Sequence, residues 1–331
     1  MTMKKWRTIL ISLLLILTLG GCDLGQPQIG VTTYPIEYLV KRIAGDKVSV
    51  LNITQTKTIT RAQLMDNPLE SLKNLDVLFV LGKLEPYLSV HTEIFNQLNL
   101  KMIDLSASAS VYAFQRYETN YVNGTRVTIE SPYYKSTLFD QVDMYQTDPY
   151  LWLDPITMIS MASTITEWLV SQYPEERTLF QKNYESLSLE LARMDADYQD
   201  LWDLELSFVS VTPSFGNWQK AFGINVYPLI LSRFGVLPSE AQLQFIMTQI
   251  KDSGVQYIVH EPNLTEDMEA LYERVKTELK LESVELHNLA FLSEEDSAQN
   301  KNYIGIMLEN LSTLEKMLPI SYAEESTETN P

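Results

Sequence analysis

The stretch EERTLFQKNYESLSLELARMDADYQDLWDL, residues 175–204, decides the fold, because one alternating pattern runs on either side of it. Its apolar residues recur at alternating steps of four and three, which predicts a single amphipathic helix. These residues are Phe180, Tyr184, Leu187, Leu191, Met194, Tyr198 and Leu201. At 1.5 Å per residue the helix would span about 45 Å, which is longer than most single domains need. We therefore predict that a helix over residues 175–205 links two halves of the chain.

The same spacing is also typical of a coiled coil, in which a second helix would cover the apolar stripe. Only about three heptads are present, however, and stable coiled coils usually need more. We therefore favour packing of this helix along two domains of the same chain.

Short β-rich runs alternate with amphipathic stretches on both sides of this helix, which predicts an α/β fold with mainly parallel sheets. Before the helix we expect strands at residues 28–33, 48–53, 77–81 and 102–105. After it we expect strands at 206–211, 225–227, 255–259 and 283–286, with helices at 239–251, 265–279 and 301–318. The prediction is thus two βα-repeat domains, an N-terminal one over 28–174 and a C-terminal one over 206–320, joined by one long linking helix.

Residues 106–147 interrupt this rhythm with a segment that is both aromatic and polar. Its aromatic residues include Tyr112, Phe114, Tyr117, Tyr121, Tyr133, Tyr134 and Tyr145. Asn123-Gly124 lies between β-favouring side chains, which predicts the turn of a hairpin. So long a departure from regular structure is usually either functional or disordered.

The chain begins with a basic segment and an apolar run, and its only cysteine follows. The apolar run, residues 8–19, is too short to cross a bilayer of about 30 Å as a helix. These features predict a signal peptide over residues 1–21. The run LGGC that ends at Cys22 is similar to the cleavage box of bacterial lipoproteins, which implies a lipid on Cys22 and a tether over 22–27. A stop-transfer anchor with an incidental cysteine is the other interpretation.

Composition and motifs exclude several functions. The one cysteine is assigned to the leader boundary, so a packed core and not a disulfide must stabilise the mature chain. The net charge of −18 repels nucleic acid and anionic lipid headgroups, so we expect no nucleic-acid partner. Residues 321–331 form a polar, acidic tail that we expect to be disordered.

The sequence has no nucleophile elbow, dinucleotide fingerprint, phosphate loop or His-Glu-x-x-His motif, so we do not expect an enzyme.

Several passages resemble the metal-binding lipoproteins of bacterial ABC importers, which bind zinc or manganese. They are VTTYP (31–35), KNLDVLFV (73–80), DPYLWLDP (148–155), FGV (234–236) and the Glu-Pro pair at 261–262. The resemblance covers nearly the whole chain after the leader. It implies a two-domain clamp with a ligand cleft between the domains, and zinc or manganese as the transported ligand, with no other cofactor.

The same resemblance implies where the protein acts and what it contacts. It implies an exported monomer held by the lipid on Cys22 at the outer face of the cytoplasmic membrane, at the cell surface or in the periplasm. There the protein would deliver its ligand to an ABC transporter permease. Its function would be solute binding for import.

The resemblance places four metal-ligand positions in this chain, at Thr60, Tyr150, Thr212 and His287. Zinc and manganese sites use imidazole, thiolate or carboxylate donors. Threonine is a weak neutral donor, and tyrosine, with a pKa of about 10, must first lose a proton. Only His287 is a good ligand type, so we expect these positions to hold zinc or manganese weakly.

Other residues offer substitutes for the missing donors. His260 and Glu261 follow a predicted strand, at the edge where open α/β sheets place their ligands, and with His287 they would supply two imidazoles and a carboxylate. The simpler interpretation is that Glu261 caps or pairs locally and that His260 is an ordinary loop residue.

The aromatic residues suggest a different ligand. Tyr150, the tyrosines of residues 112–145 and Trp218 would line the cleft as an aromatic pocket for a small organic solute. Packing of the loop is the competing interpretation. The alternative function is therefore a family member that has lost metal binding and either binds an organic solute or acts as a surface adhesion lipoprotein.

Overall fold

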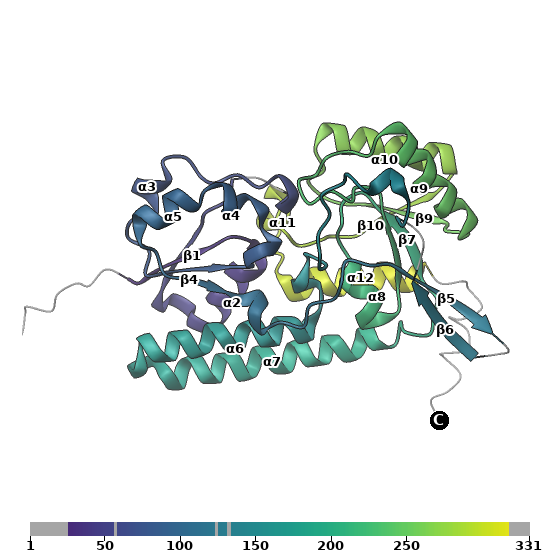
Figure 1. Ribbon diagram of the computed structural model, residues 1–331. Helices are drawn as coiled ribbons and strands as arrows, with labels where there is room; N and C mark the ends of the chain where they lie inside the picture. Colours follow the sequence, from purple (N-terminus) through teal and green to yellow (C-terminus); the bar gives the residue numbers. More distant parts are fainter. Residues whose placement is uncertain (1–25, 56–57, 123–124, 131–133, 318–331) are drawn as a thin grey trace, which may run out of the picture.

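The computed structural model describes residues 26–317 except 56–57, 123–124 and 131–133. The chain forms two lobes, which lie side by side on a base of two long helices (Figure 1). The predicted signal peptide, Cys22, most of the tether and the acidic tail lie outside the described residues. No helix in the described part of the chain is both long and apolar enough to cross a membrane.

The N-terminal lobe is built on a four-stranded parallel sheet with the order β2-β1-β3-β4. Its strands are β1 (Gln28–Val31), β2 (Ser49–Asn52), β3 (Val77–Val80) and β4 (Met102–Asp104). Its helices are α2 (Tyr34–Ala44), α3 (Pro68–Ser71), α4 (Pro86–Val90) and α5 (Thr92–Leu98). All four predicted strands are present, each within two residues of its expected ends.

Helix α2 shows how local sequence sets these elements. Pro35 lies in its first turn, where a missing N–H costs nothing, and Gly45 ends it with a φ of +61°. Ile36, Leu39 and Ile43 recur at helical spacing and are fully buried against the sheet.

The C-terminal lobe repeats this plan with the strand order β10-β9-β7-β8, again all parallel. Its strands are β7 (Ser207–Ser210), β8 (Asn225–Pro228), β9 (Tyr257–His260) and β10 (Glu282–Glu285). Its helices are α8 (Gly216–Phe222), α9 (Glu240–Asp252), α10 (Glu266–Leu279), α11 (Glu294–Ala298) and α12 (Tyr303–Lys316). The two parallel sheets confirm the predicted α/β fold class.

Helix α7 (Arg177–Gln199) runs under both lobes beside α6 (Pro155–Gln172) (Figure 1). It packs against α2 of the N-terminal lobe and against α8 and α12 of the C-terminal lobe, as expected for a helix packed along two domains. At 23 residues, or about 35 Å, it is shorter than predicted. A 3₁₀ turn at Pro174–Glu176 precedes it, and Leu201 continues the apolar pattern from a turn that follows it.

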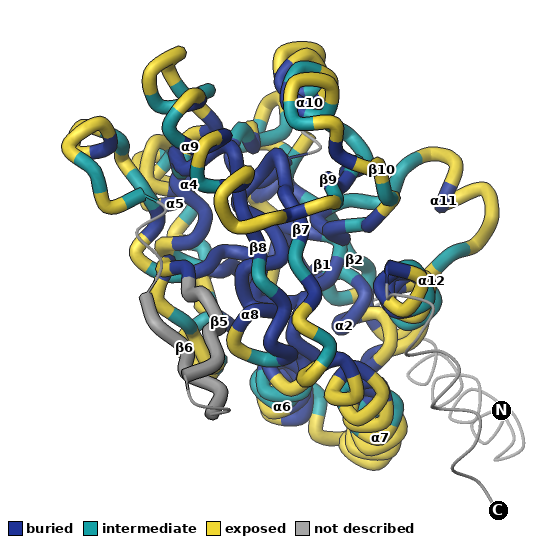
Figure 2. The backbone as a smooth tube through the Cα atoms, turned by 90° about the vertical axis from the view of Figure 1, so that its right-hand side faces the viewer, coloured by how far each residue is buried: buried dark blue, intermediate teal, exposed yellow. Residues whose placement is uncertain are grey.

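The lobes share one contiguous hydrophobic core, which includes residues of β1 and α2 as well as of β7, β9 and α12. Figure 2 shows this core as a buried centre with exposed surfaces of α7 and α10 at the periphery. In the connection from β4 to α6, Arg116 forms an ion pair with Asp148 at 2.9 Å, and both side chains are 2% exposed. A Cβ on Gly216 would lie 2.0 Å from Asp148, so only glycine fits there.

The predicted hairpin is present as an antiparallel pair of β5 (Tyr117–Val122) and β6 (Thr125–Glu130). Its turn, Asn123-Gly124, lies outside the described residues.

Candidate functional site

A buried carboxylate lies where β7, β9 and β10 end. Glu261 directly follows β9 and is 0% exposed. Its Oε1 accepts the backbone N–H groups of Val211, at 3.0 Å, and Thr212, at 2.9 Å. Its Oε2 accepts the hydroxyls of Thr212, at 2.7 Å, and Ser214, at 2.6 Å, and the side-chain amide of Asn288, at 2.9 Å. An ionised carboxylate offers about four acceptor sites, so these donors saturate it.

Tyr150 brings the N-terminal half of the chain to this carboxylate. Its hydroxyl lies 3.5 Å from that of Thr212, and its carbonyl accepts the Asn217 side-chain amide at 2.8 Å. Burial raises the pKa of Tyr150 well above its ordinary value, and the charge of Glu261 acts in the same direction. The phenol therefore stays neutral. We call Tyr150, Thr212, Ser214, Glu261 and Asn288 the interlobe cluster.

Thr60 lies against Gly235 of the C-terminal lobe. It lies in a 3₁₀ turn, and its buried hydroxyl has no hydrogen-bond partner among the described residues. A Cβ on Gly235 would lie 3.0 Å from that hydroxyl. The next residue, Arg61, donates to the Gly235 carbonyl at 2.7 Å and pairs with Asp267 at 2.8 Å. Arg61 thus connects the two lobes directly.

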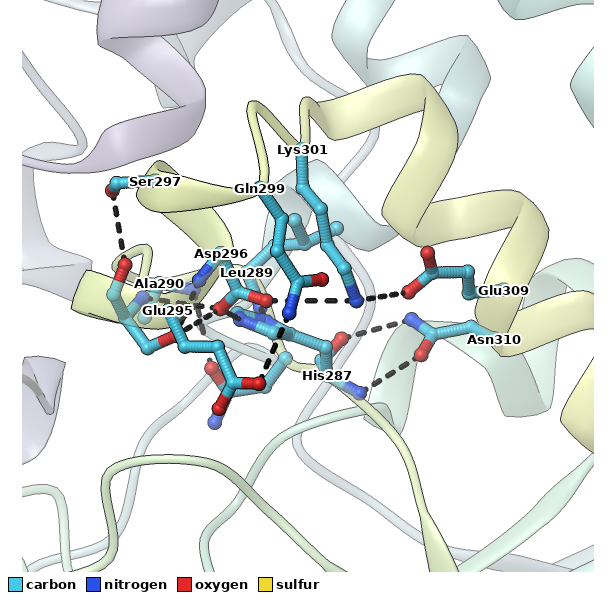
Figure 3. A network of polar contacts seen from close by, with 12 residues as sticks. His287, Leu289, Ala290, Glu295, Asp296, Ser297, Gln299, Lys301, Glu309 and Asn310 are labelled. Atoms are coloured by element: carbon cyan, nitrogen blue, oxygen red, sulfur yellow. Dashed lines mark hydrogen bonds and ion pairs between the residues drawn. The ribbon is translucent and has the colours of Figure 1, made fainter.

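His287 does not join the interlobe cluster. Its Nδ1 accepts the Leu289 backbone N–H at 2.8 Å, and its Nε2 lies 3.3 Å from Asp296, so both ring nitrogens are occupied (Figure 3). Asn310 binds the backbone N–H and C=O of His287 through its side-chain amide. Burial lowers the pKa of His287, although Asp296 acts in the opposite direction, and this favours a neutral imidazole. The neighbouring Asn288 reaches Glu261 in its place.

His260 is likewise directed away from Glu261, because successive strand residues point to opposite faces. Its Nδ1 lies 3.2 Å from Glu285 and its Nε2 lies 3.1 Å from Glu269. The substitute set of His260, Glu261 and His287 is therefore not assembled. Within the described ranges, no group of three His, Cys, Asp or Glu residues is arranged to hold a metal ion.

The prediction that Trp218 lines a cleft is wrong. The residue is fully buried, and its indole N–H donates to the Leu153 carbonyl at 2.8 Å. Its ring packs against Phe215 and Tyr198, at centroid distances of 4.8 and 5.7 Å. A large aromatic side chain with a satisfied N–H is a core residue.

The described aromatic residues of 112–145 mostly pack against one another. Tyr134 donates its hydroxyl to the Phe114 carbonyl at 2.9 Å, and the two rings stack at 5.8 Å. Tyr133 lies outside the described residues. Tyr145 also packs against Phe114, at a centroid distance of 6.1 Å, and in addition it lines a cavity that is described below.

The interlobe cluster does not fit zinc or manganese well. Its one carboxylate is already saturated, Tyr150 is neutral, and its other donors are hydroxyl and amide groups. Zinc prefers imidazole, thiolate and carboxylate ligands, and manganese prefers carboxylate and imidazole. Sequence reasoning missed Ser214 and Asn288, because neutral side chains carry no metal-ligand signal.

Comparisons with known proteins connect this fold to zinc uptake. The family model described as "Zinc-uptake complex component A periplasmic" matches residues 29–317. The chain is 26% identical over 174 residues to the zinc-binding lipoprotein AdcA of Streptococcus pneumoniae, covering 52% of this chain and 34% of that protein. It is 25% identical over 173 residues to the high-affinity zinc uptake system protein ZnuA of Bacillus subtilis, covering 52% and 53%. The matches thus span about a third of AdcA and about half of ZnuA.

A solved structure agrees with the fold. The Zn(II)-bound ZnuA-like domain of Streptococcus pneumoniae AdcA superposes with a TM-score of 0.65 at 21% identity, covering 89% of this chain and 99% of that one. The resemblance seen in the sequence is therefore confirmed, and the family is one of transport components rather than enzymes. Because the family model matches from β1 to the end of α12, the chain belongs to the family of periplasmic component A of zinc-uptake complexes.

Proposed function

We propose that this protein is the extracytoplasmic solute-binding component of a zinc- or manganese-type ABC importer and that it delivers its ligand to a membrane permease. The observation that supports this is the contact of Tyr150 with Thr212, which joins the two halves of the chain at the carboxyl ends of strands. Open α/β sheets place their ligands at this edge. The zinc-related names of the relatives support the cargo class.

The anchor and the domain limits belong to the same proposal. Residues 1–21 would be removed as a signal peptide, and a lipid on Cys22 would hold the monomer at the outer face of the cytoplasmic membrane. The lobes would comprise residues 28–174 and 206–320, with 175–205 between them. Zinc or manganese in the interlobe cluster would bind more weakly than in an imidazole site, because the Glu261 carboxylate would have to exchange its present donors for the metal.

Affinity capture from a cross-linked membrane extract tests this function. The chain, tagged at its C-terminus, is expressed in its own host, and the bound proteins are identified by mass spectrometry. We expect an ABC permease to be recovered, and the unanchored Cys22→Ser variant to recover it when added to the same detergent extract. Recovery of extracellular partners without any permease would contradict import and support adhesion.

A further inference from the structure

A cavity of about 820 Å³ opens in the N-terminal lobe, beside the carboxyl ends of β3 and β4. One side of it is closed by residues 143–147 and by Arg233 from the C-terminal lobe. Among the described residues that line it there is no member of the interlobe cluster. Its volume lies within the range of about 300–1,000 Å³ that is usual for sites of small organic ligands.

Two buried polar groups face this cavity without partners. Glu85 is 2% exposed, and its Oε2 accepts the Leu81 backbone N–H at 2.5 Å. Its Oε1 makes no hydrogen bond in the described part of the chain, although the Thr32 hydroxyl lies near enough to lower the pKa of Glu85. The hydroxyl of Tyr145, which is 5% exposed, also has no partner there. Both residues line the cavity. Buried polar atoms are nearly always paired, so these two atoms mark where a donor of a ligand belongs.

A donor for an anionic group comes from the other lobe. Arg233 pairs with Asp143 at 2.9 Å, and its guanidinium lies 4.9 Å from the centre of the Phe234 ring. Its buried Nε has no partner within the described residues. The lining therefore offers a free acceptor on Glu85 and a free donor on Arg233.

The rest of the lining is mixed, with Lys83 and several neutral polar side chains beside an apolar part. Val80, Leu84, Leu88, Phe95, Met102, Val111 and Met144 contribute to it. Such walls bind a hydrocarbon side chain, while a few placed polar groups fix its orientation. A simple anion fits poorly, because the acidic Glu85, Asp104 and Asp143 outnumber the basic Lys83 and Arg233.

We propose that this cavity binds a zwitterionic amino compound with an apolar side chain, either a free amino acid or a short peptide. The amino group donates to Glu85 Oε1 and to the Tyr145 hydroxyl, and the carboxylate accepts from Arg233. The apolar walls take the side chain. This proposal does not rest on the proposed import function, because none of the lining residues named for it belongs to the interlobe cluster.

Isothermal titration calorimetry tests the proposal on the full chain after the leader. The probes are L-leucine, leucyl-leucine, N-acetylleucine and leucinamide. We expect saturable one-site binding of leucine or of the dipeptide, and the tighter of the two identifies the source. Blocking either end should weaken binding at least tenfold, because it removes the charge that Glu85 or Arg233 recognises.

Matched variants locate the site. Glu85→Gln keeps an acceptor for the Leu81 amide but loses the charge, and Tyr145→Phe loses only the hydroxyl. We expect at least a tenfold loss of affinity for Glu85→Gln, a smaller loss for Tyr145→Phe, and none for the exposed control Glu266→Gln. The proposal is overturned if the native chain binds neither probe at millimolar concentration, or if it binds blocked and free probes equally. Unchanged affinity of a folded Glu85→Gln variant would also overturn it. If that variant does not fold, the comparison of blocked with free probes on the native chain tests the proposal instead.

Discussion

The hydroxyl of Thr212 lies 2.7 Å from Oε2 of Glu261 and 3.5 Å from the hydroxyl of Tyr150. The place where the family resemblance implies a metal ion is thus bridged by hydrogen bonds between the chain's own side chains. Ser214 and Asn288 complete the acceptor sites of the same carboxylate. A buried charge is stable only when such partners surround it, so the interlobe cluster is a structural element in its own right.

Replacing Glu261 with Gln tests that role. One carboxylate oxygen becomes an NH2 group, which cannot accept from the backbone N–H groups or from the Asn288 amide, and the negative charge is lost, so we expect the free energy of unfolding to fall by about 3 kcal/mol. Urea unfolding followed by tryptophan fluorescence measures it. The exposed Glu266→Gln control should change stability by no more than about 0.5 kcal/mol. Equal stability of the two variants would show that the cluster contributes nothing.

The buried ion pair between Arg116 and Asp148 should be far more sensitive than a surface pair. Burial raises the pKa of Asp148, and the Arg116 guanidinium opposes this. Asp148→Asn leaves a buried guanidinium without its counter-charge, so we expect a loss of about 3–5 kcal/mol. Glu240→Gln, which breaks the exposed pair with Arg274, should change stability far less, because solvent screens a surface pair. Similar losses in urea unfolding would contradict this contrast.

Glu85 should make stability depend on pH. Burial raises its pKa from 4.5 to about 7, while the Thr32 hydroxyl and the Leu81 amide act in the opposite direction. Between these values the folded protein holds a proton that the unfolded chain has released, so the free energy of unfolding falls as pH rises. The decrease between about pH 4.5 and pH 7 amounts to about 3 kcal/mol.

The measurement is urea unfolding of the native chain and of Glu85→Gln across that range. The variant cannot titrate at this position, so its profile should lack this decrease. Parallel profiles would mean that residue 85 does not carry the effect.

Arg61 should affect the closure of the lobes more than their stability. Its pair with Asp267 is partly exposed, with side chains 31% and 46% accessible, so Arg61→Gln should cost less than about 1 kcal/mol. Loss of its bond to the Gly235 carbonyl should speed amide hydrogen exchange in residues 233–237. Arg42→Gln, which breaks a pair with Glu190 on α7, is the control and should leave this segment unchanged. Unchanged exchange in Arg61→Gln would contradict a bridging role.

The sequence predicts the framework well because its signals are local. Each strand of both sheets is a short β-rich run, and the apolar spacing of α7 repeats over its whole length. The C-terminal end of α7 differs from the prediction, because Leu201 keeps the helical spacing although it lies in a turn after Gln199. Apolar residues at helical spacing indicate which side chains are buried, but they do not show where the helix ends.

The residues of the site could not be predicted as well as the strands and helices, because the local direction of the backbone determines which side chains point toward Glu261. Leu289 has a φ of +61°, and in this turn Asn288 faces Glu261 while His287 faces Asp296. Sequence spacing alone does not show which of two adjacent residues points inward at such a turn. The same limit applies to Trp218, since an indole in the core and one in a cleft look alike in a sequence.

The central claim is that the Glu261 carboxylate of the interlobe cluster is fully hydrogen-bonded to the chain's own groups and leaves no ligand free for a metal ion. Measurement of the metal content tests this claim most directly. The native chain and the His287→Ala variant are purified without chelator and dialysed. Their zinc and manganese contents are then measured by inductively coupled plasma mass spectrometry. We predict far less than one equivalent of either metal in both proteins. One equivalent of zinc that survives dialysis in the native chain and is lost in His287→Ala would contradict the account.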